Sequence, residues 1–175
     1  GHSHEPQQAQ AIMDSISASF DRRGIQLIND YGQGSAPFNG GNAISDADGY
    51  VIAVTDLGAG DFLGYKSANF AANRSGYFHY SLFVHGFTGV LAGGIAEITG
   101  DDFINATYDY ADTYTDANYY QEVAGLVMHE LGHNLSLRHG GFEDHKYKPN
   151  YNSIMNYQYQ GTGVDTNCTV IGDGL

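Results

Sequence analysis

The stretch HELGHNLSLRHGG, residues 129–141, holds three histidines and a glutamate in close succession. In an α-helix, residues four apart differ by about 40° around the axis, so His129 and His133 project from the same face and can bind one ion. Glu130 lies about 100° round from His129, which is poor for a third ligand but close enough to touch a water on that ion. The spacing therefore favours two ligands and one base.

The residues before this motif predict the helix that carries it. Asn118 and Gln121 are spaced as a capping pair, and we expect the helix to cover residues 119–135. Its buried face is an apolar stripe formed by Val123, Leu126, Val127 and Leu131.

His139 cannot reach the same ion from a continuing helix, because six residues past His133 it would lie about 9 Å further along. The chain must therefore bend after the helix. A residue in left-handed geometry would provide that bend, and glycine is its usual occupant. The candidates in this sequence are Asn134 and Ser136.

The motif HELGHNLSLRH resembles the signature of the metzincin zinc peptidases, H-E-x-x-H-x-x-G-x-x-H, and NSIMNY at 152–157 resembles the Met-turn that follows it. The resemblance implies that Met155 forms an apolar base under one catalytic zinc ion. It implies three zinc ligands: His129, His133 and His139.

Tyr157 matches the tyrosine that astacin-like and serralysin-like members place beside the zinc, where it can bind the metal or the reacting carbonyl oxygen. The specific motifs lie within residues 118–160. Residues 11–108 resemble the family only through their order of helix and strands.

The sequence departs from the family pattern in two places. Ser136 stands at the glycine position, and a non-glycine residue in left-handed geometry costs roughly 1 kcal/mol. Metzincins usually begin with a strand and finish with a helix, whereas this chain opens almost directly into a helix and has eighteen residues after Tyr157. We expect a trimmed chain or a shortened family member.

The resemblance implies hydrolysis of peptide bonds in a protein or peptide substrate. Three neutral imidazoles leave the charge of zinc undiminished, so its water loses a proton near neutral pH. Glu130 would take that proton and pass it to the departing amine, while zinc and Tyr157 stabilise the oxyanion. The substrate would pair with an edge strand, for which Ile95 and Ala96 are the candidates.

Two other functions stay open: a zinc hydrolase of a non-peptide amide, and a non-catalytic metal-binding adhesion module. The third histidine and the Met-turn count against the first. A glutamate-ligated zinc site would need a glutamate well downstream, and Glu143 is too near His139 for that.

The other histidines have simpler interpretations. We expect His79 and His85 to flank a strand, and His145 to lie on the surface, where it would not close the open metal position. His2 and His4 belong to a flexible terminus or an added tag.

The rest of the chain predicts an α+β fold: a mixed twisted sheet with an active-site helix, a backing helix on the same side, and a small C-terminal subdomain. A first helix begins near Ala11 and ends at Gly24, and a loop covers residues 31–42. Strands are expected at 25–30, at 50–57 with both faces buried, at 76–87, and as one or two pieces within 93–108 split near Gly100.

The 175 residues fit one domain, which the resemblance divides into a flexible terminus (1–10), an N-terminal subdomain (11–139) and a C-terminal subdomain (140–175). The formal charge of -13 opposes binding to nucleic acid or anionic membranes. It leaves calcium open as a further ligand, with residues 107–120 as a rim or calcium loop.

Cys168 is the only cysteine, so no internal disulfide argues for secretion, and we expect an inert thiol. Secretion, and control by a pro-segment or an inhibitor, are implied by the family resemblance. We expect a monomer.

Overall fold

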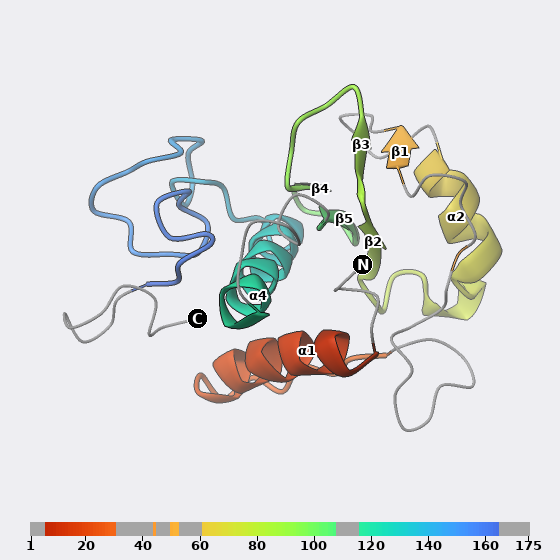
Figure 1. Cartoon of the computed structure of the whole chain (residues 1–175), viewed down its shortest axis with the longest axis horizontal. Coiled ribbons are helices and arrows are strands. Elements are labelled where there is room, and N and C mark those ends of the chain that lie inside the picture. The colour runs from red at the N-terminus through yellow and green to blue at the C-terminus, as the bar shows by residue number, and fades with distance from the viewer. Residues whose placement is uncertain (1–5, 31–43, 45–49, 53–60, 108–115, 165–175) are drawn as a thin grey trace.

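The computed structural model describes residues 6–30, 44, 50–52, 61–107 and 116–164. Their helices are α1 (Pro6–Asp21), α2 (Asp61–Asn69) and α4 (Asp116–Asn134), with a 3-10 turn, η1, at Ala72–Arg74. Their strands are β1 (Tyr50–Ile52), β2 (Tyr80–Val84), β3 (Gly86–Thr88), β4 (Gly94–Ala96) and β5 (Asp102–Ala106). Figure 1 shows the strands between α4 on one side and α2 on the other. None of the helices in these ranges has the length and apolar character to cross a membrane.

The sheet that supports the rest of the molecule has the strand order β2-β5-β4. The central strand β5 runs parallel to β2 and antiparallel to β4, and all five of its residues are buried. Strands β1 and β3 form a separate parallel pair. The predicted fold class, a mixed sheet combined with helices, is confirmed.

The core has two parts because β5 is apolar on both faces. Phe103 packs on one side against residues of α1 and α4, including Ile16 and Val127. Ile104 packs on the other side with Phe62 of α2. The two predicted helices, α1 and α4, therefore share one side of the sheet as expected, whereas α2 covers the other side. Helix α2 itself was not predicted, since Phe62 is its only fully buried side chain and its apolar pattern is weak.

Helix α1 ends as predicted, with Gly24 at a φ of +74°. The Gly24 amide donates to Asp21 O and the Ile25 amide to Phe20 O, which are the two bonds of a Schellman motif. The strand predicted over 25–30 was wrong. Ile28 is 72% exposed, and the Asn29 side chain donates back to Ser17 of α1, so this segment is held by the helix and not by a sheet.

The other strand predictions were partly correct. Strand β1 falls within the expected 50–57, but its two faces are not both buried, because Val51 is buried and Tyr50 is exposed. Residues 53–57 lie outside the described part. The single strand expected over 76–87 is two strands, because the chain leaves the larger sheet at His85 to pair with β1. The segment 93–108, expected to form one or two strands split near Gly100, forms the two strands β4 and β5 on either side of that glycine.

Helix α4 carries the histidine motif and covers the range that the sequence predicted, apart from its start. It begins at Asp116, so Asn118 lies in its first turn and the predicted capping pair was wrong. The side-chain Nε2 of Gln121 instead donates to Thr162 O at 2.5 Å. The predicted apolar stripe is confirmed, since all of its members are buried: Val123, Leu126, Val127 and Leu131.

A substitution at Gly125 can test how tightly α4 packs against the C-terminal segment. A Cβ at Gly125 would lie 1.9 Å from the Gln160 carbonyl oxygen, whereas a Cβ at Gly64 in α2 would meet nothing within 4 Å. We predict that Gly125→Ala lowers the free energy of unfolding by about 1–3 kcal/mol through overpacking. Gly64→Ala should raise it by about 0.4–1 kcal/mol, because alanine has less freedom in the unfolded chain. Urea unfolding of both variants measures the difference, and equal effects would contradict the packing.

Candidate metal centre

Three imidazole rings meet at the C-terminal half of α4. His129 and His133 project from one side of the helix, with their Nε2 atoms 3.2 Å apart. The His139 ring centroid lies 5.3 Å from that of His129 and 4.9 Å from that of His133. One ligand atom from each ring lies within 4.8 Å of the other two. The convergence predicted from the sequence is confirmed.

The bend that brings His139 back is a second Schellman motif. The Ser136 amide donates to His133 O at 2.9 Å and the Leu137 amide to Gly132 O at 2.9 Å. Ser136 has a φ of +74° and is thus the left-handed residue, while Asn134 remains helical. A tight turn follows, in which Arg138 and Gly141 exchange two backbone hydrogen bonds and His139 lies between them.

Each ring uses its Nδ1 atom for a hydrogen bond away from the centre. His129 Nδ1 bonds Ile154 O at 3.0 Å, and His133 Nδ1 bonds Leu137 O at 2.8 Å. His139 Nδ1 contacts the Asp144 carboxylate. A carbonyl oxygen only accepts hydrogen bonds, so Nδ1 carries the proton in the first two rings. Their Nε2 atoms therefore present lone pairs to the centre.

This arrangement fits a zinc ion. Two Nε2 lone pairs 3.2 Å apart repel each other unless a cation lies between them. Ligand nitrogens at 2.0–2.1 Å from a tetrahedral zinc are roughly 3.3 Å apart, close to the separation seen here. Burial lowers the pKa of His129 to about 4 and also lowers the pKa of His133, so both rings are neutral ligands at pH 7.

The described residues offer three ligands for a metal ion at this centre. Among those residues, no fourth histidine, cysteine or carboxylate joins the group. His145, the nearest alternative in sequence, is exposed as predicted. Three protein ligands and one open position are the ligand count of catalytic zinc sites, whereas structural sites use four.

Glu130 is buried beside the three rings, on the side of α4 that faces β4. A Cβ at Gly94 of β4 would lie 2.4 Å from Glu130 Oε1, so the missing side chain at Gly94 leaves room for the carboxylate. Burial raises the pKa of Glu130 to about 8. A cation held by the adjacent imidazoles would favour the ionised form.

Met155 and Tyr157 both lie near the histidine cluster. Met155 is fully buried, and a Cβ at Gly132 would lie 2.3 Å from its Sδ, so the sulfur packs against α4 close to its C-terminal end, between His129 and His133 in the chain. The Tyr157 ring centroid lies 4.6 Å from that of His139 and 5.6 Å from that of His129. Burial raises the pKa of Tyr157, and the nearby Glu130 raises it further. The Met-turn assignment and the roles of both residues stay predictions.

Asn156 holds this segment in shape and was missed at the sequence level. Its side chain is buried and donates to Lys148 O at 2.8 Å and to Tyr151 O at 2.9 Å. Its Oδ1 accepts from the Gln158 amide at 3.1 Å. An amide side chain between two predicted site residues was the available signal, since such groups often replace backbone hydrogen bonds in tight turns.

The remaining predicted positions lie around this centre. Ile95 and Ala96 belong to β4, an outer strand of the larger sheet, and are half-buried; their pairing with substrate stays a prediction. His79 directly precedes β2 and His85 lies between β2 and β3, so both flank strands as expected. His2, His4 and Cys168 lie outside the described residues.

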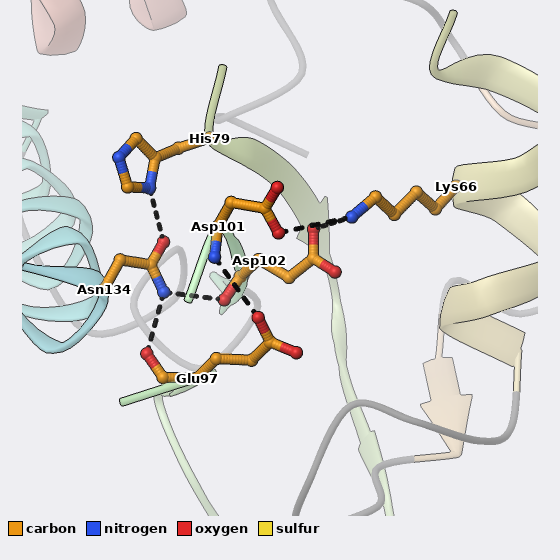
Figure 2. Close-up of polar contacts among 6 residues, drawn as sticks. All are labelled: Lys66, His79, Glu97, Asp101, Asp102 and Asn134. Carbon is orange, nitrogen blue, oxygen red and sulfur yellow. Dashed lines mark hydrogen bonds and ion pairs between the residues drawn. The ribbon is translucent and has the colours of Figure 1, made fainter. Parts of the chain in front are cut away.

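A second group of acidic side chains, Glu97, Asp101 and Asp102, lies on the β4–β5 turn and the start of β5 (Figure 2). Lys66 Nζ lies 2.5 Å from Asp102 Oδ1 and 3.6 Å from Asp101 Oδ1. The lysine compensates part of the negative charge, so the group is an ion-pair network of the fold. Most of the expected calcium loop, residues 108–115, lies outside the described part.

His139 differs from the other two histidines because the partner of its Nδ1 atom is a side chain, that of Asp144. A mutation can therefore remove this partner. We predict that Asp144→Ala weakens zinc binding by about 10–100-fold, the usual effect of removing such a partner. Asp144→Asn keeps an accepting oxygen and should lose less. Zinc affinity is measured by competition with a chromophoric chelator.

The matched control for this prediction is Glu143→Ala. Glu143 is a neighbouring exposed carboxylate that pairs with Lys148 at 2.7 Å. An equal loss of zinc affinity in the Glu143 and Asp144 variants would show a general charge effect and would refute the specific contact.

Comparison with known families agrees with this geometry. Residues 64–140, somewhat less than half of the chain, match the metallo-peptidase family M12B, reprolysin-like. No curated protein and no solved structure matches the chain. The match contains the whole stretch from His129 to His139, and a peptidase family implies protein or peptide substrates. Residues 64–140 are thus similar to the reprolysin-like metallopeptidases, and the three histidines fit the zinc site of such an enzyme.

Proposed function

We propose that this protein is a zinc-dependent endopeptidase. The observation that carries the proposal is the convergence of one ligand nitrogen from each of three imidazoles, next in the chain to one buried carboxyl group, Glu130. The family match supports peptidase chemistry in general, and the geometry supports a specific division of roles.

Zinc, when bound, supplies Lewis acidity toward water and toward a peptide carbonyl. Glu130 is the base of the reaction: a carboxylate oxygen takes the proton of the attacking water and later delivers it to the amine nitrogen that leaves. Its burial excludes bulk water, so the proton stays within the site. One residue thereby serves both proton transfers.

Tyr157 stabilises the charge that develops on the carbonyl oxygen. Its ring lies beside His139, and its phenol can donate a hydrogen bond. A donor that is already oriented stabilises an oxyanion without reorganisation at the moment of reaction. Contact between the Lys146 ammonium and the Tyr157 ring, at 5.2 Å, helps to hold that orientation.

The substrate binds in extended form along β4. Strand β4 pairs with β5 on one side and is an outer strand of the three-stranded sheet, so its other side can accept a further strand. Gly94 on the same strand adjoins Glu130. A peptide paired beside Ile95 and Ala96 would therefore pass close to the base. Secretion, regulation by a pro-segment and a monomeric state remain predictions of the family resemblance.

Glu130→Gln tests the proposed mechanism. The amide keeps the shape of the side chain but cannot take a proton, so peptide cleavage should fall by about 10²–10⁴-fold. Zinc content should stay at the wild-type value, because Glu130 is not among the three ligands. Cleavage of a mixed peptide library is followed by mass spectrometry, and zinc content by elemental analysis.

The control is Glu143→Gln, which changes an exposed carboxylate near His139 and should leave cleavage unchanged. Retained cleavage in Glu130→Gln would exclude the proposed base. A wild-type protein that holds zinc but cleaves no peptide would instead favour the metal-binding module considered above.

A further inference from the structure

Two strained residues touch each other next to the metal centre. Thr99 and Ser136 have φ values of +62° and +74°, and they are the only non-glycine residues with positive φ in the part of the chain that the structure describes. Such a conformation costs roughly 1 kcal/mol for an L-residue, and more for a β-branched one such as threonine. The hydroxyl groups of the two residues are hydrogen bonded to each other at 2.9 Å.

Thr99 also binds the backbone of a metal-ligand residue. It lies in the turn between β4 and β5, and its amide donates to His133 O at 3.1 Å. The carbonyls in the last turn of a helix lack partners within the helix, so such a donor stabilises the helix end. Thr99 therefore contacts the end of α4 twice, once through His133 and once through Ser136.

The side chain of Asn134, in α4, also binds the two ends of this turn, as Figure 2 shows. Its Nδ2 donates to Glu97 O and to Asp102 O, each at 2.9 Å, and its Oδ1 bonds His79 Nδ1 at 3.0 Å. Asn134 is buried, and its bond to Asp102 O is shielded from water. The β4–β5 turn is thus held against the helix end on both sides of Thr99.

A glycine at position 136 would adopt the left-handed conformation without strain. Ser136 adopts it with strain, and its hydroxyl then finds a partner in a residue that is strained in the same way. One hydrogen bond contributes about 0.5–1.5 kcal/mol, which is comparable to the strain of Ser136. The bend therefore depends on a residue from another element.

We propose that Thr99 and Ser136 are a coupled pair of positioning residues that sets the bend after α4 and so the approach of His139 to the metal. The pair takes over what glycine does at this position of the motif. This inference rests on the zinc site of the proposed function. It also links the metal centre to β4, because the turn that contains Thr99 directly follows that strand.

The test measures zinc affinity of the apo-protein by chelator competition. Thr99→Val and Ser136→Ala each remove one hydroxyl but keep the backbone amide and the Cβ. Each should weaken zinc binding by about tenfold, the lower range for residues that orient ligands. The double variant should bind zinc no more weakly than either single variant, because one bond has been removed in all three.

Three further variants make the result specific. Thr99→Ser keeps the hydroxyl and should bind zinc as the wild type does. Ser136→Gly removes the hydroxyl together with the strain and should also stay near wild type. Ser67→Ala is the matched control, since its hydroxyl bonds Gly64 O in α2, away from the metal centre.

Urea unfolding of the apo-proteins separates positioning from stability. Thr99 and Ser136 are exposed, so the variants should fold. Loss of apo stability with unchanged zinc affinity would overturn the inference, and so would additive losses of affinity in the double variant. If the wild-type protein does not bind zinc, the proposed function is wrong as well. If the wild type and all variants bind zinc equally well, only the positioning role of Thr99 and Ser136 is wrong.

Discussion

The constraint on which this site depends is that three imidazole lone pairs must point at one place although they repel one another. Two rings come from one face of α4, and the third returns through a bend and a tight turn between Arg138 and Gly141. Hydrogen bonds from Nδ1 orient all three rings before any ion binds. Because this orientation is built into the fold, a cation that enters gains attraction without reorganising its ligands.

Strand β5 is what makes that orientation rigid. It is buried along its whole length, packs against α4 through Phe103, and accepts the Asn134 amide at Asp102 O. Its neighbour β4 approaches α4 so closely that Gly94 is needed to leave room for Glu130. The base, the edge strand and the helix end are therefore positioned by a single sheet, which explains how groups that lie far apart in sequence can act together.

The sequence was informative where structure is decided locally. The helical spacing of His129 and His133 and the need for a bend near Ser136 follow from backbone geometry alone, and both were correctly predicted. Local patterns failed where tertiary contacts decide. The alternation at 25–30 suggested a strand, but those residues lie along α1, and helix α2 has too few buried residues to give a clear pattern.

Asp144 and Thr99 could not be identified from the sequence for a related reason. Thr99 is 37 residues from Ser136, and nothing in its local sequence indicates a left-handed conformation, which glycine or asparagine would have suggested. Asp144 is only five residues from His139, but its neighbour His145 is the residue whose type attracts attention in a search for metal ligands. Side-chain orientation in an irregular segment depends on turns that spacing does not determine.

The Schellman motifs at the ends of α1 and α4 show how a serine differs from a glycine at the left-handed position. Gly24 ends α1 with no atom within 4 Å of where its Cβ would be, and needs no support from elsewhere. Ser136 ends α4 with the same pair of backbone bonds but has a hydroxyl partner from the β4–β5 turn. Since the strain and the extra bond are each about 1 kcal/mol, the exchange is nearly neutral for stability. Its consequence is that the bend before His139 responds to the strand beside it, which a glycine at that position would not require.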